Sequence, residues 1–372
     1  MKVYRLKKAI YDLKQAPRAW HERIDRHFIK NGFQKNASEP TLYVKTQGAD
    51  EVLIVCLYMD DLIYTGNSVA LIHDFKRIMV AEFEMTDLGL MSYFLGLEVK
   101  QCDAEIFISQ EKYVNDLLKK FMMKDCNPVK TPMITNHKYS LDDGEENADF
   151  QVYRNLVGSL LYLTNSCLDI LQATGLLSRF MQNPSKIHYG AAKRVLRYLK
   201  GTCSYGLWYS NTNNFKFCRF SNSDWAGSID DHKSTTGYLF KLRSNAISWC
   251  SKEQPSTALS SSEVACQTIW LRRILGDMKL HQKEATTIFC DNQSTIAMTK
   301  NPIHHSHARH IDTRHHFIRE LVVEGSITIE HYNSQEQVAD LFTKSLSFEK
   351  FVYFRDKLGV VDFCIKGKYV SM

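Results

Sequence analysis

The sequence lacks the cysteine spacings of a metal or redox motif. Its ten cysteines are scattered over 372 residues, and no two of them form a CxxC pair. This excludes a zinc ribbon and a thioredoxin-like motif. Several cysteines, such as Cys56 and Cys290, lie in apolar stretches and are expected to be buried free thiols. Free thiols in this number indicate a reducing compartment.

Long apolar runs are missing as well. Residues 1–11 are basic and amphipathic and contain no apolar segment of the kind that a secretory signal needs. No run approaches the length of a membrane span. We therefore expect an intracellular protein, cytoplasmic or nuclear, with no membrane partner. Internal repeats and low-complexity tracts are also lacking, which leaves an ordinary globular chain.

The composition is typical of folded domains. Hydrophobic residues make up 44% of the chain and charged residues 24%, and the length suffices for two or three separate cores. The formal net charge is +6. This mild basic bias permits a polyanionic partner without requiring one.

The first 200 residues predict a strand–turn–strand unit followed by helices. Pro128 and Pro132, with the acidic stretch 142–149, indicate a loop or linker. A second strand pair is expected at 93–100 and 105–109. Helices are expected at about 70–84, 111–122, 151–181 and 187–200.

The remaining chain has a different order of elements. Strands are expected at 216–221, 236–242, 245–250, 286–290 and 326–332. Helices are expected at about 261–275, 293–299, 309–323 and 335–344. Three consecutive strands followed by alternating helices and strands predict a mixed sheet with flanking helices. The fold class is therefore α+β or α/β.

A pair of adjacent acids stands between two apolar, β-rich runs in residues 51–66. Asp60 and Asp61 would form the tip of a hairpin. Adjacent carboxylates repel each other, but they suit two-metal phosphoryl transfer, in which clustered carboxylates hold ions about 3.5–4 Å apart. The alternative is a solvated acidic turn, because Asp is a common turn residue.

The residues around this pair carry a family resemblance. Residues 58–61 read YMDD, the YxDD signature of reverse transcriptases, and residues 6–20, 94–99 and 108–113 read LKKAIYDLKQAPRAW, FLGLEV and ISQEKY. The chain resembles the C-terminal part of a copia-type LTR retrotransposon Pol polyprotein. The resemblance implies a truncated reverse-transcriptase palm and thumb at 1–135, connection helices at 136–212, an RNase H-like domain at 213–346 and a C-terminal tail at 347–372.

The resemblance assigns roles in the polymerase part. Asp60 and Asp61 would be catalytic Mg²⁺ ligands, and Gln15 would touch the incoming nucleotide. The basic helix expected at 187–200 would lie near the nucleic-acid backbone and contact it through Lys193, Arg194 and Arg197. The alternative is that this helix only presents a solvated face. The family's third carboxylate belongs to a strand upstream of residue 6. Because a lost ligand lowers metal affinity or activity about 10–100-fold, we expect little polymerase activity.

A second carboxylate set follows from the resemblance to RNase H. Residues 290–294 (CDNQS) and 338–344 (VADLFTK) match the family's motifs and imply Asp291 and Asp340 as catalytic Mg²⁺ ligands. The family's first-strand aspartate is replaced by Asn222. Its helical glutamate is missing, because about eight residues, or roughly two helical turns, are deleted after residue 263. Asp224 or Glu263 could take over a lost role, and the alternative for Asp224 is a loop residue.

Six histidines gather between residues 304 and 316. They are His304, His305, His307, His310, His315 and His316. Histidine is a common metal ligand, but no cysteine or acid stands at metal-finger spacing. We favour a loop and helix start near the RNase H cleft over a metal site.

The resemblance implies a Pol fragment that acts on RNA–DNA hybrids, or on an RNA template with a DNA primer, with Mg²⁺ as cofactor. Both catalytic sets are incomplete, so we expect weak or absent activity. The alternative is an inactive relic that binds nucleic acid. The missing N-terminal Pol segments would be partners if the chain is part of a longer polyprotein.

Overall fold

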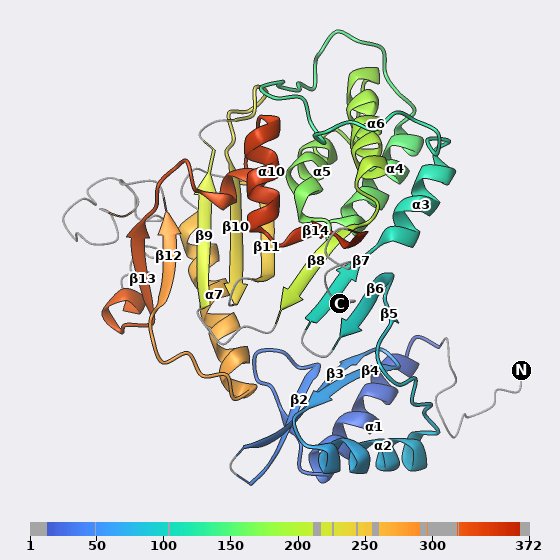
Figure 1. The fold of residues 1–372 in the computed structure, drawn as a ribbon, viewed down its shortest axis with the longest axis vertical. Coiled ribbons are helices and arrows are strands. Elements are labelled where there is room, and N and C mark those ends of the chain that lie inside the picture. The colour runs from blue at the N-terminus through green and yellow to red at the C-terminus, as the bar shows by residue number, and fades with distance from the viewer. Residues whose placement is uncertain are drawn as a thin grey trace, which may run out of the picture. The chain divides into compact units, whose positions relative to one another are not determined.

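A computed structural model gives the structure of residues 13–48, 50–102, 105–210, 217–224, 227–242, 245–254, 260–290, 296, 318 and 320–364 (Figure 1). The chain divides into two compact units. Unit 1 comprises Met1–Gly89 and Cys266–Lys283, and unit 2 comprises Leu90–Ala265 and Glu284–Met372. The four-part division drawn from the sequence stays a prediction. In the described part, no helix has the length and apolarity to cross a membrane.

Unit 1 is built on an antiparallel sheet in the order β1-β2-β3-β4. Its strands are β1 (Gln34–Lys35), β2 (Leu42–Gln47), β3 (Glu51–Tyr58) and β4 (Asp61–Gly66). Its helices are α1 (Ala16–Lys30), α2 (Val69–Phe83) and the part of α7 (Ser260–Asp277) from Cys266 onward. Strand β3 alternates in burial, and its buried residues join Phe28 of α1 and Phe75 of α2 in one core. The predicted hairpin and the helix at 70–84 are confirmed.

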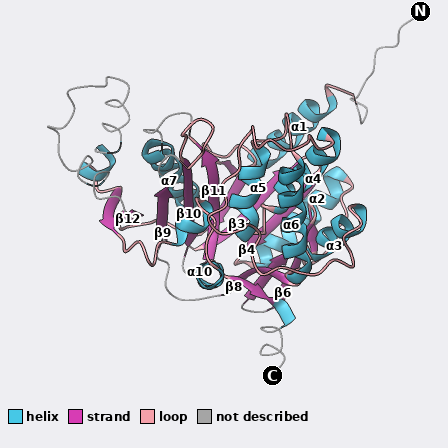
Figure 2. Cartoon of the chain, turned by 90° about the horizontal axis from the view of Figure 1, so that it is seen from above, coloured by secondary structure: helices cyan, strands magenta, loops and turns pink. Residues whose placement is uncertain are grey.

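Unit 2 contains two five-stranded sheets. The first has the order β14-β8-β7-β6-β5, from β5 (Tyr93–Phe94), β6 (Leu97–Cys102), β7 (Glu105–Ser109), β8 (Tyr205–Ser210) and β14 (Val360–Asp362). Helices α3 (Glu111–Lys120), α4 (Phe150–Leu163), α5 (Leu171–Ser178) and α6 (Lys186–Gly201) belong to the same unit, and α4, α5 and α6 pack side by side (Figure 2).

The second sheet has the order β11-β10-β9-β12-β13. Strands β9 (Phe217–Ser223), β10 (Thr235–Leu242) and β11 (Asn245–Glu253) pair antiparallel, while β12 (Thr286–Cys290) and β13 (Ile327–His331) run parallel to β9. The predicted mixed sheet is confirmed. Helix α7 (Ser260–Asp277) follows β11, and the 3-10 turn η2 (Val338–Phe342) packs against β10 and β9.

Two sequence-based expectations were wrong in detail, and a strand was missed. The helix expected at 151–181 is broken into α4, the 3-10 turn η1 (Leu168–Ile170) and α5. At the break, Thr164 turns its hydroxyl back to the Leu161 carbonyl, competing with the helical ladder. The helix expected at 335–344 is only the turn η2, and strand β8 was not foreseen. The helices expected at 293–299 and 309–323 fall largely outside the described residues.

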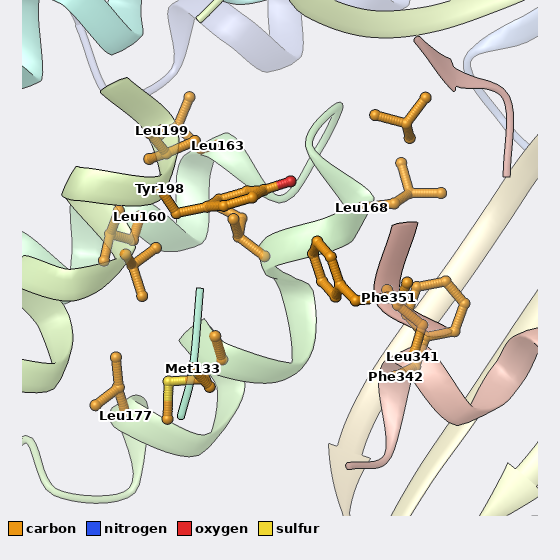
Figure 3. Packing of buried hydrophobic residues seen from close by; sticks show 14 of the residues in the cluster. Met133, Leu160, Leu163, Leu168, Leu177, Tyr198, Leu199, Leu341, Phe342 and Phe351 are labelled. Atoms are coloured by element: carbon orange, nitrogen blue, oxygen red, sulfur yellow. The ribbon is translucent and has the colours of Figure 1, made fainter. Parts of the chain in front are cut away.

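The C-terminal segment is part of the core of unit 2. Helix α10 (Phe348–Lys357) confirms the short helix expected in the tail, and β14 pairs with β8. The rings of Tyr198 and Phe351 meet edge to face with centroids 5.6 Å apart, beside Leu341 and Phe342 of η2 (Figure 3). Cys56 and Cys290 are not in disulfides, as expected, but they are half-buried rather than fully buried.

Candidate nucleic-acid-processing centre

The structure brings together Asn222 and Asp340, two of the residues that the sequence proposes for the RNase H-like site. Asn222 lies near the end of β9, opposite Gly237 of β10. A Cβ at Gly237 would stand 2.7 Å from the Phe342 Cβ and 3.0 Å from the Ala339 carbonyl oxygen. Gly237 therefore permits η2, which carries Asp340, to lie directly on the sheet.

Both carboxylate oxygens of Asp340 receive donors from this chain. The Asn222 Nδ2 donates to Asp340 Oδ1, and the Lys344 Nζ stands 2.8 Å from Asp340 Oδ2. The Asn222 amide is oriented by the backbone N–H of Ser223, which donates to Asn222 Oδ1 at 2.7 Å. Because that oxygen is engaged, the amide hydrogens face Asp340.

The Asp340 carboxylate depends on these two donors because it is buried. The Asp340 side chain is only 3% exposed, while the Lys344 side chain is 51% exposed. A buried carboxylate without partners is strongly destabilising, whereas charge-assisted hydrogen bonds to it each contribute about 1.5–3 kcal/mol. The Asn222 amide and the Lys344 ammonium therefore stabilise Asp340 without any added cation.

Asp224 lies two residues beyond Asn222 and has a different role in the described contacts. Its carboxylate accepts the backbone N–H of Thr235, and its own N–H donates to the Thr235 carbonyl at 3.0 Å. Burial raises the pKa of the Asp224 carboxyl, against the opposing Thr235 N–H and nearby cations. These contacts extend the β9–β10 pairing, and the replacement role for Asp224 stays a prediction.

Several predicted residues cannot be placed. Asp291 and the histidine cluster 304–316 lie outside the described residues. Glu263 falls in the first turn of α7, but its side chain is outside the described part. Their predicted roles stay predictions.

The paired acids of unit 1 stand on an exposed turn. Tyr58 pairs with Asp61, so Met59 and Asp60 form a two-residue loop, with Met59 at a φ of 53°. The Trp20 Nε1 of α1 donates to the Met59 carbonyl at 2.7 Å. Asp60 and Asp61 are both exposed. Gln15 is exposed at the N-cap of α1, and its side chain makes no capping hydrogen bond.

The basic helix α6 uses two of its three predicted contact residues inside the protein. The Arg194 guanidinium donates to Thr131 Oγ1 at 3.1 Å, and the Arg197 Nε donates to the Asn127 carbonyl at 2.8 Å. Burial lowers the pKa of Arg194. The Lys193 ammonium lies 4.5 Å from the Tyr189 ring centroid. Their role toward nucleic acid stays a prediction.

At Asp340 the described side chains do not fit a bound divalent ion. Within the described part of the chain, no group of three or more His, Cys, Asp or Glu side chains is placed to hold a metal. At Asp340 the neighbouring groups are an amide N–H and an ammonium, both of which are donors and cannot be metal ligands. The Mg²⁺ expectation therefore gains no support from these side chains.

Comparison with known proteins identifies the family. Residues 1–135 match the family described as reverse transcriptase (RNA-dependent DNA polymerase). A putative transposon Ty5-1 protein of Saccharomyces cerevisiae is 30% identical over 253 residues, which cover 68% of this chain and 82% of that protein. The Pol polyprotein of transposon RE1 from Arabidopsis thaliana is 36% identical over 366 residues. The chain belongs to the copia-type retrotransposon Pol family.

The copia-type relatives are much longer than this chain. The RE1 match covers 96% of this chain but 25% of the relative, and the match to the Pol polyprotein of transposon TNT 1-94 from Nicotiana tabacum covers 96% and 28% at 36% identity. The chain thus spans about a quarter of the length of these curated relatives. Activities of the whole polyprotein are therefore proposals for this chain.

Solved structures resemble this copia-type chain only weakly. A foamy viral protease–reverse transcriptase in complex with double-stranded DNA is 10% identical with a TM-score of 0.47, covering 86% of this chain and 49% of that one. An RNase H1 in complex with an RNA/DNA hybrid is 12% identical with a TM-score of 0.28, covering 34% and 94%. A likeness at this level supports no conclusion about binding.

Sequence reasoning missed two residues that shape the sites. Lys344 was noted only as part of a motif, although its spacing of four residues from Asp340 is the usual spacing of a helical ion pair. Trp20, within the matched segment 6–20, gave no signal of its contact with Met59, because the two are 39 residues apart.

Proposed function

We propose that this chain binds RNA–DNA hybrids and neither extends nor cuts them. The observation that carries the proposal is the state of Asp340. Its buried carboxylate is held by the Asn222 amide and the Lys344 ammonium, so the fold itself supplies the donors that a catalytic centre would leave to metal ions.

The charges around Asp340 support the proposal that the chain does not cut RNA. An aspartate at position 222 would add a second negative charge beside Asp340, and paired carboxylates are what draw divalent ions into a nuclease centre. The neutral amide removes that charge, and Lys344 neutralises the one that remains. In unit 1, Asp60 and Asp61 belong to no described group of three metal-binding side chains.

Binding is supported by ancestry and charge. The family match gives a polymerase lineage, and the net charge of +6 favours a polyanion. Binding of this kind weakens as salt rises, because each phosphate contact releases counterions.

The test combines binding and chemistry in one reaction. A DNA primer on a labelled RNA template is incubated with the chain, Mg²⁺ and four deoxynucleotides. Anisotropy reports binding, and a denaturing gel reports both strand lengths. We expect salt-sensitive binding with unchanged strands. Primer growth or RNA shortening would contradict the proposal.

A single substitution tests whether the residue at position 222 is what prevents RNA cleavage. Asn222→Asp restores the carboxylate beside Asp340, and Asn155→Asp on the exposed face of α4 makes the same change elsewhere. RNA shortening gained by Asn222→Asp alone would assign the block to position 222.

A further inference from the structure

Unit 2 contains an open pocket beside the Asp340 centre. Its volume is about 640 Å³, within the range of ordinary ligand sites. Five segments line it: the loop 136–141, helix α5 with the two residues that follow it, residues 224 and 227–235 after β9, Glu253 of β11, and residues 343–345 after η2. Lys344, which contacts Asp340, is among the lining residues, so pocket and centre adjoin.

The acids of the pocket bind the chain's own donors. Asp230 accepts the Ser140 hydroxyl at 2.5 Å and the Leu141 N–H at 2.9 Å. Asp231 pairs with Lys233 at 2.6 Å, and Glu253 pairs with Arg179 at 3.1 Å. A carboxylate that is already paired repels an incoming anion less than a bare one does.

The groups left for a ligand are one cation and two amides. In the described part of the chain, the side chains of Asn136, Lys138 and Gln172 line the pocket and make no hydrogen bond or ion pair within the fold. Two side-chain amides offer both donors and acceptors, and a lysine offers a point charge for a phosphate.

The pocket also has an apolar, aromatic side. Leu176 of α5 lines it, and so does Phe180, whose ring stacks on His188 with centroids 3.8 Å apart. The exposed His137 ring lies edge to face on Tyr139 at 4.5 Å. Aromatic rings of this kind are platforms for nucleobases.

We propose that this pocket binds one unpaired nucleotide, with its base beside His137 and Leu176, its base edge at Asn136 and Gln172, and its phosphate at Lys138. The inference rests on the proposed binding of hybrids and adds which part of the nucleic acid the chain recognises. The nucleotide is either a free monophosphate or the single-stranded end of a bound hybrid.

The experiment compares a blunt labelled hybrid with the same hybrid carrying a short single-stranded RNA overhang. Because stacking of a base on an aromatic ring adds to affinity, we expect the overhang to tighten binding about tenfold. Leu176→Trp, which fills the pocket, and Lys138→Glu should each abolish the difference in affinity between overhanging and blunt hybrids. Lys124→Glu, an exposed charge reversal outside the pocket lining, should keep it.

The outcomes separate the two proposals. Competition by adenosine monophosphate at the overhang-binding site would support a free nucleotide as an occupant, and its failure to compete would assign the pocket to strand ends. Equal affinity for blunt and overhanging hybrids would overturn the pocket inference and leave hybrid binding standing. Failure of every hybrid to bind would overturn both.

Discussion

The two acidic sites of this chain differ in how fully the fold satisfies them. In unit 1, Asp60 and Asp61 stand exposed on a two-residue turn, where water can solvate them. In unit 2, Asp340 is buried and takes one donor on each oxygen. A buried carboxylate must find its donors within the fold, and for Asp340 these donors are the Asn222 amide and the Lys344 ammonium.

The contrast teaches that a motif match does not fix a role. Both sites match the family's motifs at their aspartates, yet only the exposed pair keeps oxygens open to an added ligand. We therefore expect the free energy of unfolding to depend far more on Asp340 and its donors than on the turn that carries Asp60 and Asp61.

The largest effect is expected for Gly237→Ala. The added methyl would meet the Phe342 Cβ at 2.7 Å, and overpacking of this kind costs about 2–3 kcal/mol. Gly158→Ala, in α4 with nothing within 4 Å of the new Cβ, should instead stabilise by about 0.5–1 kcal/mol. Urea unfolding of both variants checks this, and similar midpoints would contradict the close packing of η2.

The next largest effect is expected when the charge of Asp340 is removed, and the same change at Asp60 is the comparison. Asp340→Asn weakens two charge-assisted contacts and should destabilise by about 2 kcal/mol. Asp60→Asn, on an exposed turn, should stay within about 0.5 kcal/mol of the native chain. Chemical denaturation measures both. Equal losses would remove the distinction between a structural and a solvated carboxylate.

A smaller effect is expected at the turn of unit 1. Trp20→Phe keeps an aromatic ring near Phe83 but removes the hydrogen bond to the Met59 carbonyl. The loss should be about 1 kcal/mol, with faster amide exchange confined to the turn 58–61. Unchanged exchange there would show that Trp20 does not position the acidic turn.

The smallest predicted effect is a pH dependence from His188. Its Nδ1 accepts the backbone N–H of Ser185 at 3.0 Å at the start of α6, and burial lowers its pKa below 6.5, against the opposing charges of Asp143 and Asp230. Because the folded pKa is depressed, the neutral ring's contribution is present above pH 6.5 and is lost as pH falls below it. Thermal melts of His188→Gln should lack that pH step.

The sequence predicted what depends on local pattern and missed what depends on packing. Apolar, β-rich runs on either side of the paired acids located β3 and β4, and the five strands of the mixed sheet were predicted close to their observed bounds. The sequence did not predict the break at Thr164 in the helix expected at 151–181, because the apolar spacing continues across it. Asn222 and Asp340 were both singled out, but their contact spans 118 residues and needed the fold.

The most direct test of the central claim is a Mg²⁺ titration followed by thermal unfolding of the native chain and of Asn222→Asp. We predict that Mg²⁺ leaves the native melting temperature unchanged. The variant should melt lower without Mg²⁺, because two buried carboxylates repel, and should recover on its addition. A native chain whose melting temperature rises with Mg²⁺, through a site lost in Asp340→Asn, would contradict the account.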